Sequence, residues 1–418
     1  MENRRNLLWL AMSALLLTGL LSGRSIFFTL TYVLFGLVLS SRLWSWMAIW
    51  GIRLSRRTHQ KRSQVGKNFA ETFKVTNANW LPKLWLEVRD YSDIPGHRAS
   101  AVVPFLKPQG SFEWRVQTVC MARGVFQLGP MLISSGDPFG LFVTTRRVNA
   151  IDHVLVHPPM VMLHKFYLPA GMLSGGDTQR YLTQQITPNA VGVREYVHGD
   201  SINRIHWKST ARRNKPIVKE FELDPMVDIW LFVDFSAQSL VEAPDLKRVG
   251  TDGVVLIPSV RDLPPSTEEY SVIIAASLAG YFIRERRSLG FLAYMPQREV
   301  FQPDRSPRQL QRVLEALALA RSHSQQTLVS MLSNEAINFA RGATLIVVTS
   351  SHDPRFVQRL QILRMRGIRT VCVYIDPTSF QYRVDSLACR EALMASGIPT
   401  TLVRHGDDLS QVLMQRTF

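Results

Sequence analysis

The sequence has few cysteines and comparatively few acidic residues. Its only cysteines, Cys120, Cys372 and Cys389, lie far apart and form no CxxC pair. This pattern argues against a disulfide framework and a thiolate zinc site, and it favours a reducing compartment. The 418 residues contain 33 Asp and Glu against 49 Lys and Arg, a formal net charge of +16. Charge alone does not distinguish nucleic acid, anionic lipid and acidic protein as the partner.

Familiar catalytic and nucleotide-binding motifs are also missing. The sequence has no GxSxG elbow, no GxxxxGK[ST] loop, no HExxH and no GxGxxG after a predicted strand. A hydrolase would have to use Asp200, His206 or Asp234 in a cleft, and spacing alone does not indicate one. We therefore do not expect an enzyme. The alternative is a metal-dependent or phosphate-handling enzyme, or a module that binds an anionic ligand.

Long apolar runs occur only near the N-terminus. Leu7 to Leu21 and Ile26 to Leu39 are almost wholly apolar, with a short break between them. Each run approaches the roughly 20 residues of a membrane-spanning helix, and tryptophans near residue 46 suit a membrane interface. We predict a transmembrane helical hairpin over residues 1–52. A cleaved signal peptide is the alternative, which the closely following second run disfavours.

Basic residues flank both apolar runs. Arg4 and Arg5 precede the first run, and a basic cluster from Arg53 to Arg62 follows the second. By the positive-inside rule we predict a two-pass protein with both termini in the cytoplasm. The cluster is either attracted to anionic lipid headgroups or is a solvated flank that sets the topology.

Residues 53–165 have the pattern of short strands separated by turns containing Pro, Gly and Asn. Partial alternation of apolar residues predicts strands at Phe69–Val75, Leu84–Val88, Ser111–Val116, Val125–Leu128 and Val154–Val156. This spacing is typical of a small β-sandwich. We expect immunoglobulin-like strands without the disulfide.

Residues 166–225 begin with a polar stretch that we interpret as a linker and continue into a dense charged segment, GVREYVHGDSINRIHWKSTARRNKPIVKEF, from Gly192 to Phe221. Under one interpretation an ion-pair and turn network joins two domains, with Trp207 as a core anchor; its members are Arg194, Glu195, Asp200 and Arg204. Under the other, cationic residues bind an acidic partner or a phosphate-bearing ligand; they are Arg194, Arg204, Lys208, Arg212 and Arg213. The interspersed acidic residues argue against nucleic-acid binding.

Residues 226–418 alternate between strand and helix patterns. Strands are predicted at Asp228–Val233, Phe291–Tyr294, Leu345–Thr349, Thr370–Ile375 and Thr400–Val403. Helices are predicted at Ser271–Arg287, Pro307–Ala320, Thr327–Ala340, Pro354–Arg366 and Ser386–Ser396. We therefore predict an α/β doubly wound domain, preceded by a β-sandwich-like domain and an N-terminal transmembrane helical hairpin.

The charged segment resembles a family signature. The short motifs that carry the resemblance are Arg194-Glu195-Tyr196, Gly199-Asp200, Arg204-Ile205-His206-Trp207-Lys208 and Ala211-Arg212. They resemble the signature of the bacterial domain-of-unknown-function 58 family, and the following α/β region is similar to a von Willebrand factor A domain. The resemblance covers roughly residues 190 to 400. It implies a MoxR-type AAA+ ATPase as partner, and hence a membrane-anchored cytoplasmic adaptor or chaperone component in a bacterial inner membrane.

The resemblance also implies a divalent-cation site. A-type domains bind Mg²⁺ through an Asp-x-Ser-x-Ser loop with a distant Thr and Asp, because Mg²⁺ prefers oxygen ligands. Asp234 and Ser236 match the loop, whereas Gln238 occupies the third position. Thr267 is a loose match to the distant hydroxyl, and the distant aspartate comes late, at Asp353. A magnesium site at Asp234 and Ser236 is therefore one interpretation, and a degenerate site is the other.

Overall fold

The computed structural model describes residues 2–168, 190–197, 205–221, 227–242, 248–249, 254–255, 266–295, 297–380 and 385–415. The chain forms two compact units. The first comprises residues 1–159 and 247–262, and the second comprises residues 160–246 and 263–418. Most of the predicted linker lies outside the described residues.

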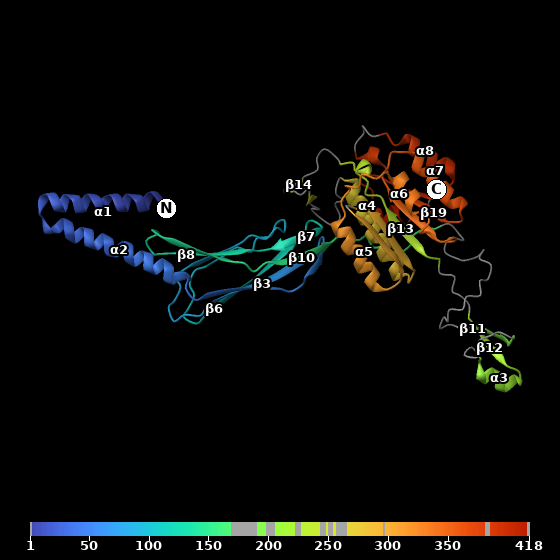
Figure 1. The fold of residues 1–418 in the computed structure, drawn as a ribbon, viewed down its shortest axis with the longest axis horizontal. Helices are drawn as coiled ribbons and strands as arrows, with labels where there is room; N and C mark the ends of the chain where they lie inside the picture. Colours follow the sequence, from blue (N-terminus) through green and yellow to red (C-terminus); the bar gives the residue numbers. More distant parts are fainter. Residues whose placement is uncertain are drawn as a thin grey trace. The chain divides into compact units, whose positions relative to one another are not determined.

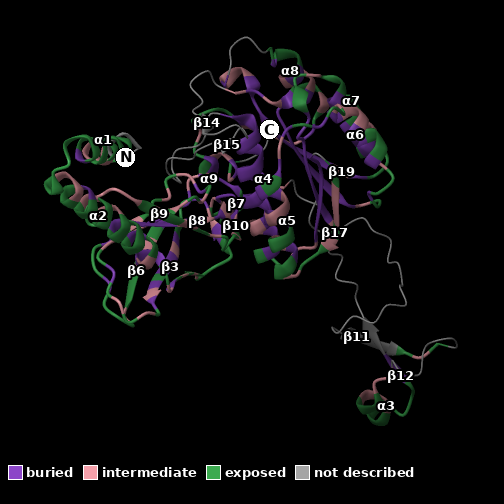
Figure 2. Ribbon diagram, turned by 60° about the vertical axis from the view of Figure 1, so that its left-hand side comes forward, coloured by how far each residue is buried: buried purple, intermediate pink, exposed green. Residues whose placement is uncertain are grey.

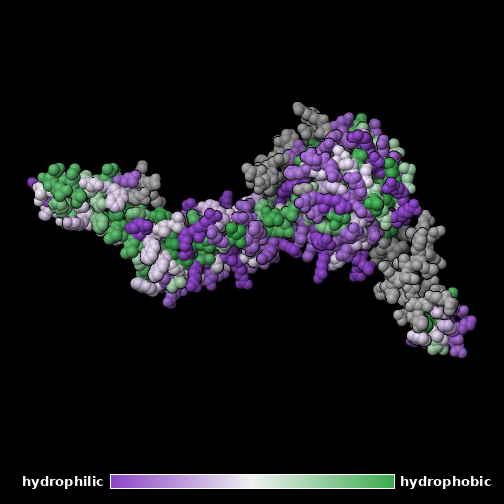
Figure 3. Space-filling model, viewed as in Figure 1, coloured by the Kyte–Doolittle hydropathy of each residue, from purple (hydrophilic) through white to green (hydrophobic). Residues whose placement is uncertain are grey.

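The first unit begins with two apolar helices, α1 (Glu2–Ser22) and α2 (Ser25–Ile49), which lie side by side and run in opposite directions (Figure 1). Hydrophobic residues make up much of the face of these helices that Figure 3 shows. α2 is long and apolar enough to cross a membrane, whereas the apolar part of α1, Asn6–Ser22, is shorter. The prediction of apolar N-terminal helices is confirmed, and the two-pass topology stays a prediction.

The last turns of α2 pack against the β-rich part of the same unit. They contact β8 (Met131–Gly136) and β9 (Val143–Val148). The buried residues here follow the spacing of one helix face; they are Ser41, Ser45, Ala48 and Ile49. The hydroxyl oxygens of Ser45 and Thr144 lie 2.8 Å apart. α2 is therefore an apolar helix over its first turns and a packed part of the β unit over its last.

Among the described residues, three sheets make up most of the rest of the first unit. One pairs β1 (Ile52–Thr58), β3 (Asn68–Asn77) and β6 (Ser111–Val119) in that order. A second has the order β5 (Ala101–Val103), β4 (Leu86–Asp90), β8, β9. The third has the order β2 (Arg62–Gln64), β10 (Asp152–His157), β7 (Gly124–Leu128). Short strands β14 (Arg248–Val249) and β15 (Val254–Val255) pair separately.

The first two of these sheets share one hydrophobic core. Buried residues of β1 and β3, such as Ile52 and Val75, pack with Leu86, Val88 and Ile133 of β4 and β8. Two sheets that face each other across one apolar layer have the packing of a sandwich. An immunoglobulin-like strand arrangement stays a prediction.

The second unit contains a six-stranded sheet in the order β17-β16-β13-β18-β19-β20. Its strands are β13 (Ile229–Val233), β16 (Leu289–Tyr294), β17 (Arg298–Asp304), β18 (Thr344–Thr349), β19 (Arg369–Ile375) and β20 (Thr400–Val403). All neighbours are parallel except β17, which pairs antiparallel with β16. The predicted parallel sheet is confirmed, and its antiparallel edge strand was not predicted.

Helices cover both faces of this sheet. Side chains of α4 (Thr267–Arg284), α5 (Pro307–Leu319) and α9 (Leu409–Val412) pack with Leu231 and Val233 on one face. Side chains of α6 (Leu328–Glu335), α7 (Arg355–Met365) and α8 (Leu387–Ser396) pack with Trp230 and Phe232 on the other. Because neighbouring residues of a strand point to opposite faces, β13 serves both cores. Figure 2 shows the interior of the sheet around β19 in purple, as buried, whereas the edge strand β17 is intermediate or exposed.

The strand order reverses its direction between β13 and β18. The chain adds β16 and β17 on one side of β13, and β18, β19 and β20 on the other. In an open α/β sheet, the crevice at such a switch point, outside the carboxyl ends of the strands, is where ligands bind. The residues after β13 and β18 are therefore the first place to look for a site.

Candidate functional site

The charged segment forms a small hairpin with a helix between its strands. β11 (Ala190–Glu195) pairs antiparallel with β12 (Ile217–Phe221), and α3 (Trp207–Arg213) lies before β12 in the chain. The backbone NH of His206 donates to the carbonyl of Ile217 over 2.7 Å, and the backbone NH of Ile217 donates to the hydroxyl of Thr210 over 3.0 Å. These bonds hold the start and the middle of α3 to β12.

Only part of the predicted ion-pair network lies in the described residues. Gly199, Asp200 and Arg204 lie outside them, as does the side chain of Arg194. Glu195 pairs with Lys215 at 3.4 Å, and both side chains are more than half exposed. Such an exposed pair contributes little to stability. The backbone NH of the half-buried Tyr196 donates to the Pro216 carbonyl over 2.9 Å, which closes the hairpin.

The prediction that Trp207 anchors a core is wrong. Its side chain is 67% exposed at the start of α3, and α3 has no buried residue. Lys208, Arg212 and Arg213 are exposed on the same short helix. An indole is costly to leave in water, because its large apolar surface gains most from burial. α3 is therefore a basic surface element with an unburied aromatic side chain.

A second cluster lies at the switch point of the α/β sheet. Asp234 directly follows β13 and is 2% exposed. Its Oδ1 accepts from the backbone NH of Ser236 over 3.0 Å, and its Oδ2 accepts from the Thr349 hydroxyl over 2.7 Å. Burial raises the pKa of Asp234 against the opposing effect of these bonds. The carboxyl group is held by neutral donors, with no cation beside it among its described partners.

Hydroxyl groups bind one another around this carboxyl group. The Ser236 and Ser239 hydroxyls lie 2.9 Å apart. The Ser239 carbonyl accepts from Thr267 over 3.0 Å and from Ser350 over 2.6 Å. These bonds fasten the loop after β13, which includes a 3₁₀ turn (Ala237–Ser239), to the start of α4 and to the end of β18.

The residues of this cluster do not fit a magnesium ion. Mg²⁺ needs near-octahedral oxygen ligands and is held in proteins mainly by carboxylates and water. The cluster contributes one carboxyl group, and both of its oxygens accept hydrogen bonds from neighbours. Gln238, at the third loop position, is exposed. Asp353 is bonded instead to the Arg355 guanidinium, which lowers the pKa of that carboxyl group. The geometry favours the degenerate interpretation of the site.

Thr349 is the member of this cluster that the sequence did not reveal. It ends β18, and the register places Val348 beside Val233, so that Thr349 comes next to Asp234. Thr267, the loosely matched hydroxyl, contacts the Ser239 backbone and not the aspartate. The partner of a buried carboxyl group depends on which strands pair, and only the fold provides that.

A buried ion cluster in the first unit was also missed. Arg56 of β1 pairs with Glu71 at 3.4 Å and with Asp90, and His97 Nε2 lies 3.2 Å from Glu71 and 3.3 Å from Asp90. All four side chains are at most 4% exposed. The expectation that the cluster Arg53 to Arg62 is a solvated or lipid-facing flank is therefore wrong for Arg56.

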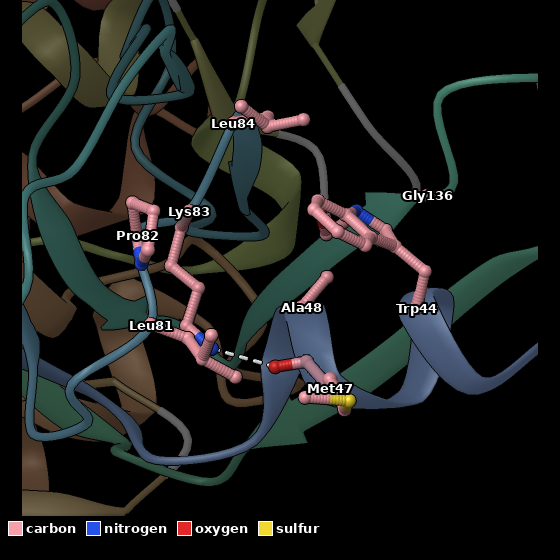
Figure 4. A pocket seen from close by; sticks show the side chains of 9 residues that line it. Trp44, Met47, Ala48, Leu81, Pro82, Lys83, Leu84 and Gly136 are labelled. Carbon is pink, nitrogen blue, oxygen red and sulfur yellow. Dashed lines mark hydrogen bonds between the residues drawn. The ribbon is translucent and has the colours of Figure 1, made fainter. Parts of the chain in front are cut away.

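The carboxyl end of α2 is capped from the loop after β3. The Asn79 side-chain amide donates to the Trp50 carbonyl over 2.7 Å, and Lys83 Nζ donates to the Met47 carbonyl over 2.6 Å (Figure 4). The last carbonyls of a helix have no partner within the helix, and donors from outside satisfy them. This loop therefore binds the end of the apolar helix to the β unit.

Fold and sites together define a mixed α/β protein with an apolar helix at its N-terminus and an exposed basic hairpin before its sheet. Residues 192–249 match the family described as "Protein of unknown function DUF58". The "Uncharacterized protein YeaD" of Bacillus subtilis is 22% identical over 245 residues, which cover 56% of this chain and 61% of that protein. The chain thus covers less than two thirds of the relative's length.

Among solved structures, the chain is similar to the CARDB domain of the PF1109 protein from Pyrococcus furiosus. The TM-score is 0.19 and the identity 14%, over 25% of this chain and 86% of that one. Red sea bream transglutaminase gives a TM-score of 0.17 and 16% identity, over 25% of this chain and 15% of that one. Scores this low add nothing to the fold described above.

Proposed function

We propose that this protein is a membrane-anchored cytoplasmic adaptor or chaperone component that works with a MoxR-type AAA+ ATPase. The observation that carries the proposal is the exposed Trp207 on the basic helix α3. Tryptophan and arginine are the residues most enriched at the energetic centres of protein interfaces. The family match over residues 192–249 covers this same helix.

The membrane attachment rests on the two N-terminal helices. Both contain a long apolar stretch, and one of them is long and apolar enough to span a bilayer. Arg4 and Arg5 lie at the start of α1, before its apolar part, and further basic residues follow α2. We therefore propose a two-pass protein of a bacterial inner membrane, with both termini in the cytoplasm.

We also infer that the α/β part of the second unit is a von Willebrand factor A-type domain without its metal. Its support is a central strand that ends in Asp234-Phe235-Ser236, at the switch point of a mainly parallel sheet. The hydroxyl network takes up the oxygen atoms that would otherwise face a cation. In this proposal the domain is a rigid support for partner binding.

Capture by a purified ATPase tests the adaptor proposal. The full-length protein, solubilised in detergent, is immobilised, and a MoxR-type AAA+ ATPase of the same organism is added with ATP and Mg²⁺. Trp207→Ala should weaken binding at least about thirtyfold, because hot-spot truncations cost about 2 kcal/mol or more. Trp80→Ala removes an equally exposed tryptophan of the first unit, 72% exposed, and should leave binding unchanged.

A second experiment tests the charge of α3. Arg212→Glu should weaken capture of the ATPase more at low salt than at high salt, because salt screens exposed charges. Arg359→Glu makes the same change on the exposed surface of α7 and is the matched control. Failure of the wild-type protein to bind the ATPase in any nucleotide state would refute the proposal.

A further inference from the structure

Lys83 is a buried cation whose charge is only partly satisfied. The residue is 2% exposed, and within the described part of the chain its Nζ donates one hydrogen bond, to the Met47 carbonyl. An ammonium group has three donors and a full charge, whereas the end of a helix offers about half a negative charge. Burial lowers the pKa of Lys83, and no carboxylate among the described residues opposes this effect. A bound anion would remove this electrostatic cost.

A pocket lies beside this ammonium group. It is enclosed by the last turns of α2, the loop before β4 and the end of β8, and its volume is about 50 Å³. Figure 4 shows Trp44 and Ala48 of α2 on one side and Lys83 and Leu84 on the other. A space of this size holds about three or four water molecules or one phosphate-sized group. Lysine binds phosphate as a point charge.

The position of the pocket along α2 indicates where its ligand comes from. About 20 helical residues cross the roughly 30 Å hydrocarbon core, and 20 residues counted from Ser25 end at Trp44. Trp44 is 43% exposed at the mouth of the pocket, and Trp46 stacks on Trp50 with centroids 5.9 Å apart. Tryptophans concentrate at the level of lipid headgroups. The pocket therefore opens at the depth of the headgroup layer.

We propose that this pocket binds the headgroup phosphate of an anionic phospholipid, with Lys83 as its cation. The apolar wall formed by Trp44, Ala48 and Leu84 suits the glycerol region of a lipid, whereas a free phosphate ion would lose its hydration there without compensation. The inference rests on the membrane attachment proposed above. It does not depend on the ATPase partner.

The test uses thermal unfolding of the full-length protein in detergent micelles. Phosphatidylglycerol, added to about ten times its Kd, should raise the unfolding temperature by about 3 to 5 °C. Phosphatidylcholine and inorganic phosphate should give no comparable rise. Lys83→Met keeps the length of the side chain but removes its charge, and should abolish the effect. Lys74→Met removes an exposed charge of β3 and should keep it.

Two outcomes would overturn the inference. One is an undiminished shift in Lys83→Met, and the other is an equal shift with inorganic phosphate, which would indicate a general anion site. If Lys83→Met does not fold, the wild-type protein still decides the question. A phosphatidylglycerol with a photoreactive headgroup should then label peptides containing Trp44 or Lys83, and labelling confined to other peptides would refute the site. Sedimentation with membranes, measured in parallel, tests the attachment separately.

Discussion

At the scale of single residues, the protein buries ionisable groups in two opposite ways. In the first unit, Arg56 and His97 oppose Glu71 and Asp90, so the buried cluster is neutral overall when His97 is protonated. At the end of β13, Asp234 has only neutral donors. A buried charge is tolerated when it is paired, and an unpaired carboxyl group tends to become neutral instead.

The ion cluster predicts a stability that falls at alkaline pH. Burial alone would lower the pKa of His97, but the hydrogen bonds and charges of Asp90 and Glu71 outweigh it and raise the pKa from 6.5 to about 9. Because the pKa of His97 is higher in the folded state than in the unfolded state, protonated His97 stabilises the fold. This contribution is fully present below pH 6.5 and is lost as the pH rises through about 9.

His97→Gln should therefore cost about 3 to 5 kcal/mol at pH 7, because it leaves two buried carboxylates, Glu71 and Asp90, with Arg56 as the one cation of the cluster. Thermal unfolding of the full-length protein at pH 7 and pH 10 checks this. The difference between wild type and variant should shrink at the higher pH. His153→Gln, at an exposed histidine of β10, is the control. A variant as stable as wild type at pH 7 would contradict the prediction.

The cluster around Asp234 predicts that an amide can replace the acid. Because burial raises the pKa of Asp234, ionisation destabilises the fold, and Asp234→Asn should unfold at or above the wild-type temperature at pH 7. Asp234→Ala should cost about 1 to 3 kcal/mol, since it leaves two buried donors without an acceptor. Millimolar Mg²⁺ should not shift the wild-type unfolding temperature relative to EDTA. A stabilisation by Mg²⁺ that Asp234→Asn abolishes would restore the metal site.

At the scale of elements, the α/β strands were predictable because each is a buried apolar run between helical patterns. β17 was missed because it is an edge strand whose residues are exposed or half-buried and include Pro303, a residue that interior strands do not accept. β1 was missed for a different reason. Its sequence, IRLSRRT, reads as a basic flank, and Arg56 becomes buried only because Glu71 and Asp90 come from other strands. The local sequence pattern around Arg56 does not show these two carboxylates, because they lie far away in the sequence.

The site residues divide in the same way into those that the local sequence reveals and those that depend on distant partners. Asp234 and Ser236 were found because they follow a predicted strand at a place where ligands bind. Thr349 and Lys83 were not found, because the role of each depends on a partner far away in the sequence. Trp207 was found as a residue of the signature, but one of the two interpretations of that segment placed it in a core, where its 67% exposure excludes it.

The turn after α2 predicts a sensitive glycine. Gly51 has φ +73°, and a Cβ there would lie 2.5 Å from the Asn79 side chain that caps the helix. Gly51→Ala should cost at least about 1 to 2 kcal/mol for the left-handed backbone, and more if the cap is lost. Gly36→Ala, inside α2, where the new Cβ meets no atom within 4 Å apart from its chain neighbours and the nearby backbone of the same helix, should be neutral or slightly stabilising. Thermal unfolding of both full-length variants distinguishes them, and equal effects would contradict the prediction.

At the scale of the whole molecule, the end of α2 belongs to the β unit as much as to the pair of apolar helices. A chain that starts at residue 41 keeps the buried face of α2 and the carbonyls that Asn79 and Lys83 bind. A chain that starts at residue 52 loses both. We expect the shorter chain to unfold at a lower temperature and to be cut faster by protease between β3 and β4. Equal stability of the two truncations would show that the helix end contributes nothing.

The packing of α2 on β8 and β9 has a mechanical consequence. A flexible linker would let a cytoplasmic unit rotate freely beneath the bilayer, but here a continuous helix runs into the β unit and is fastened there by Ser45, Asn79 and Lys83. When a spanning helix tilts to match a thinner bilayer, a unit fixed to its end turns through the same angle. In a membrane-inserted chain, the angle between the β unit and the bilayer therefore changes with the thickness of the bilayer.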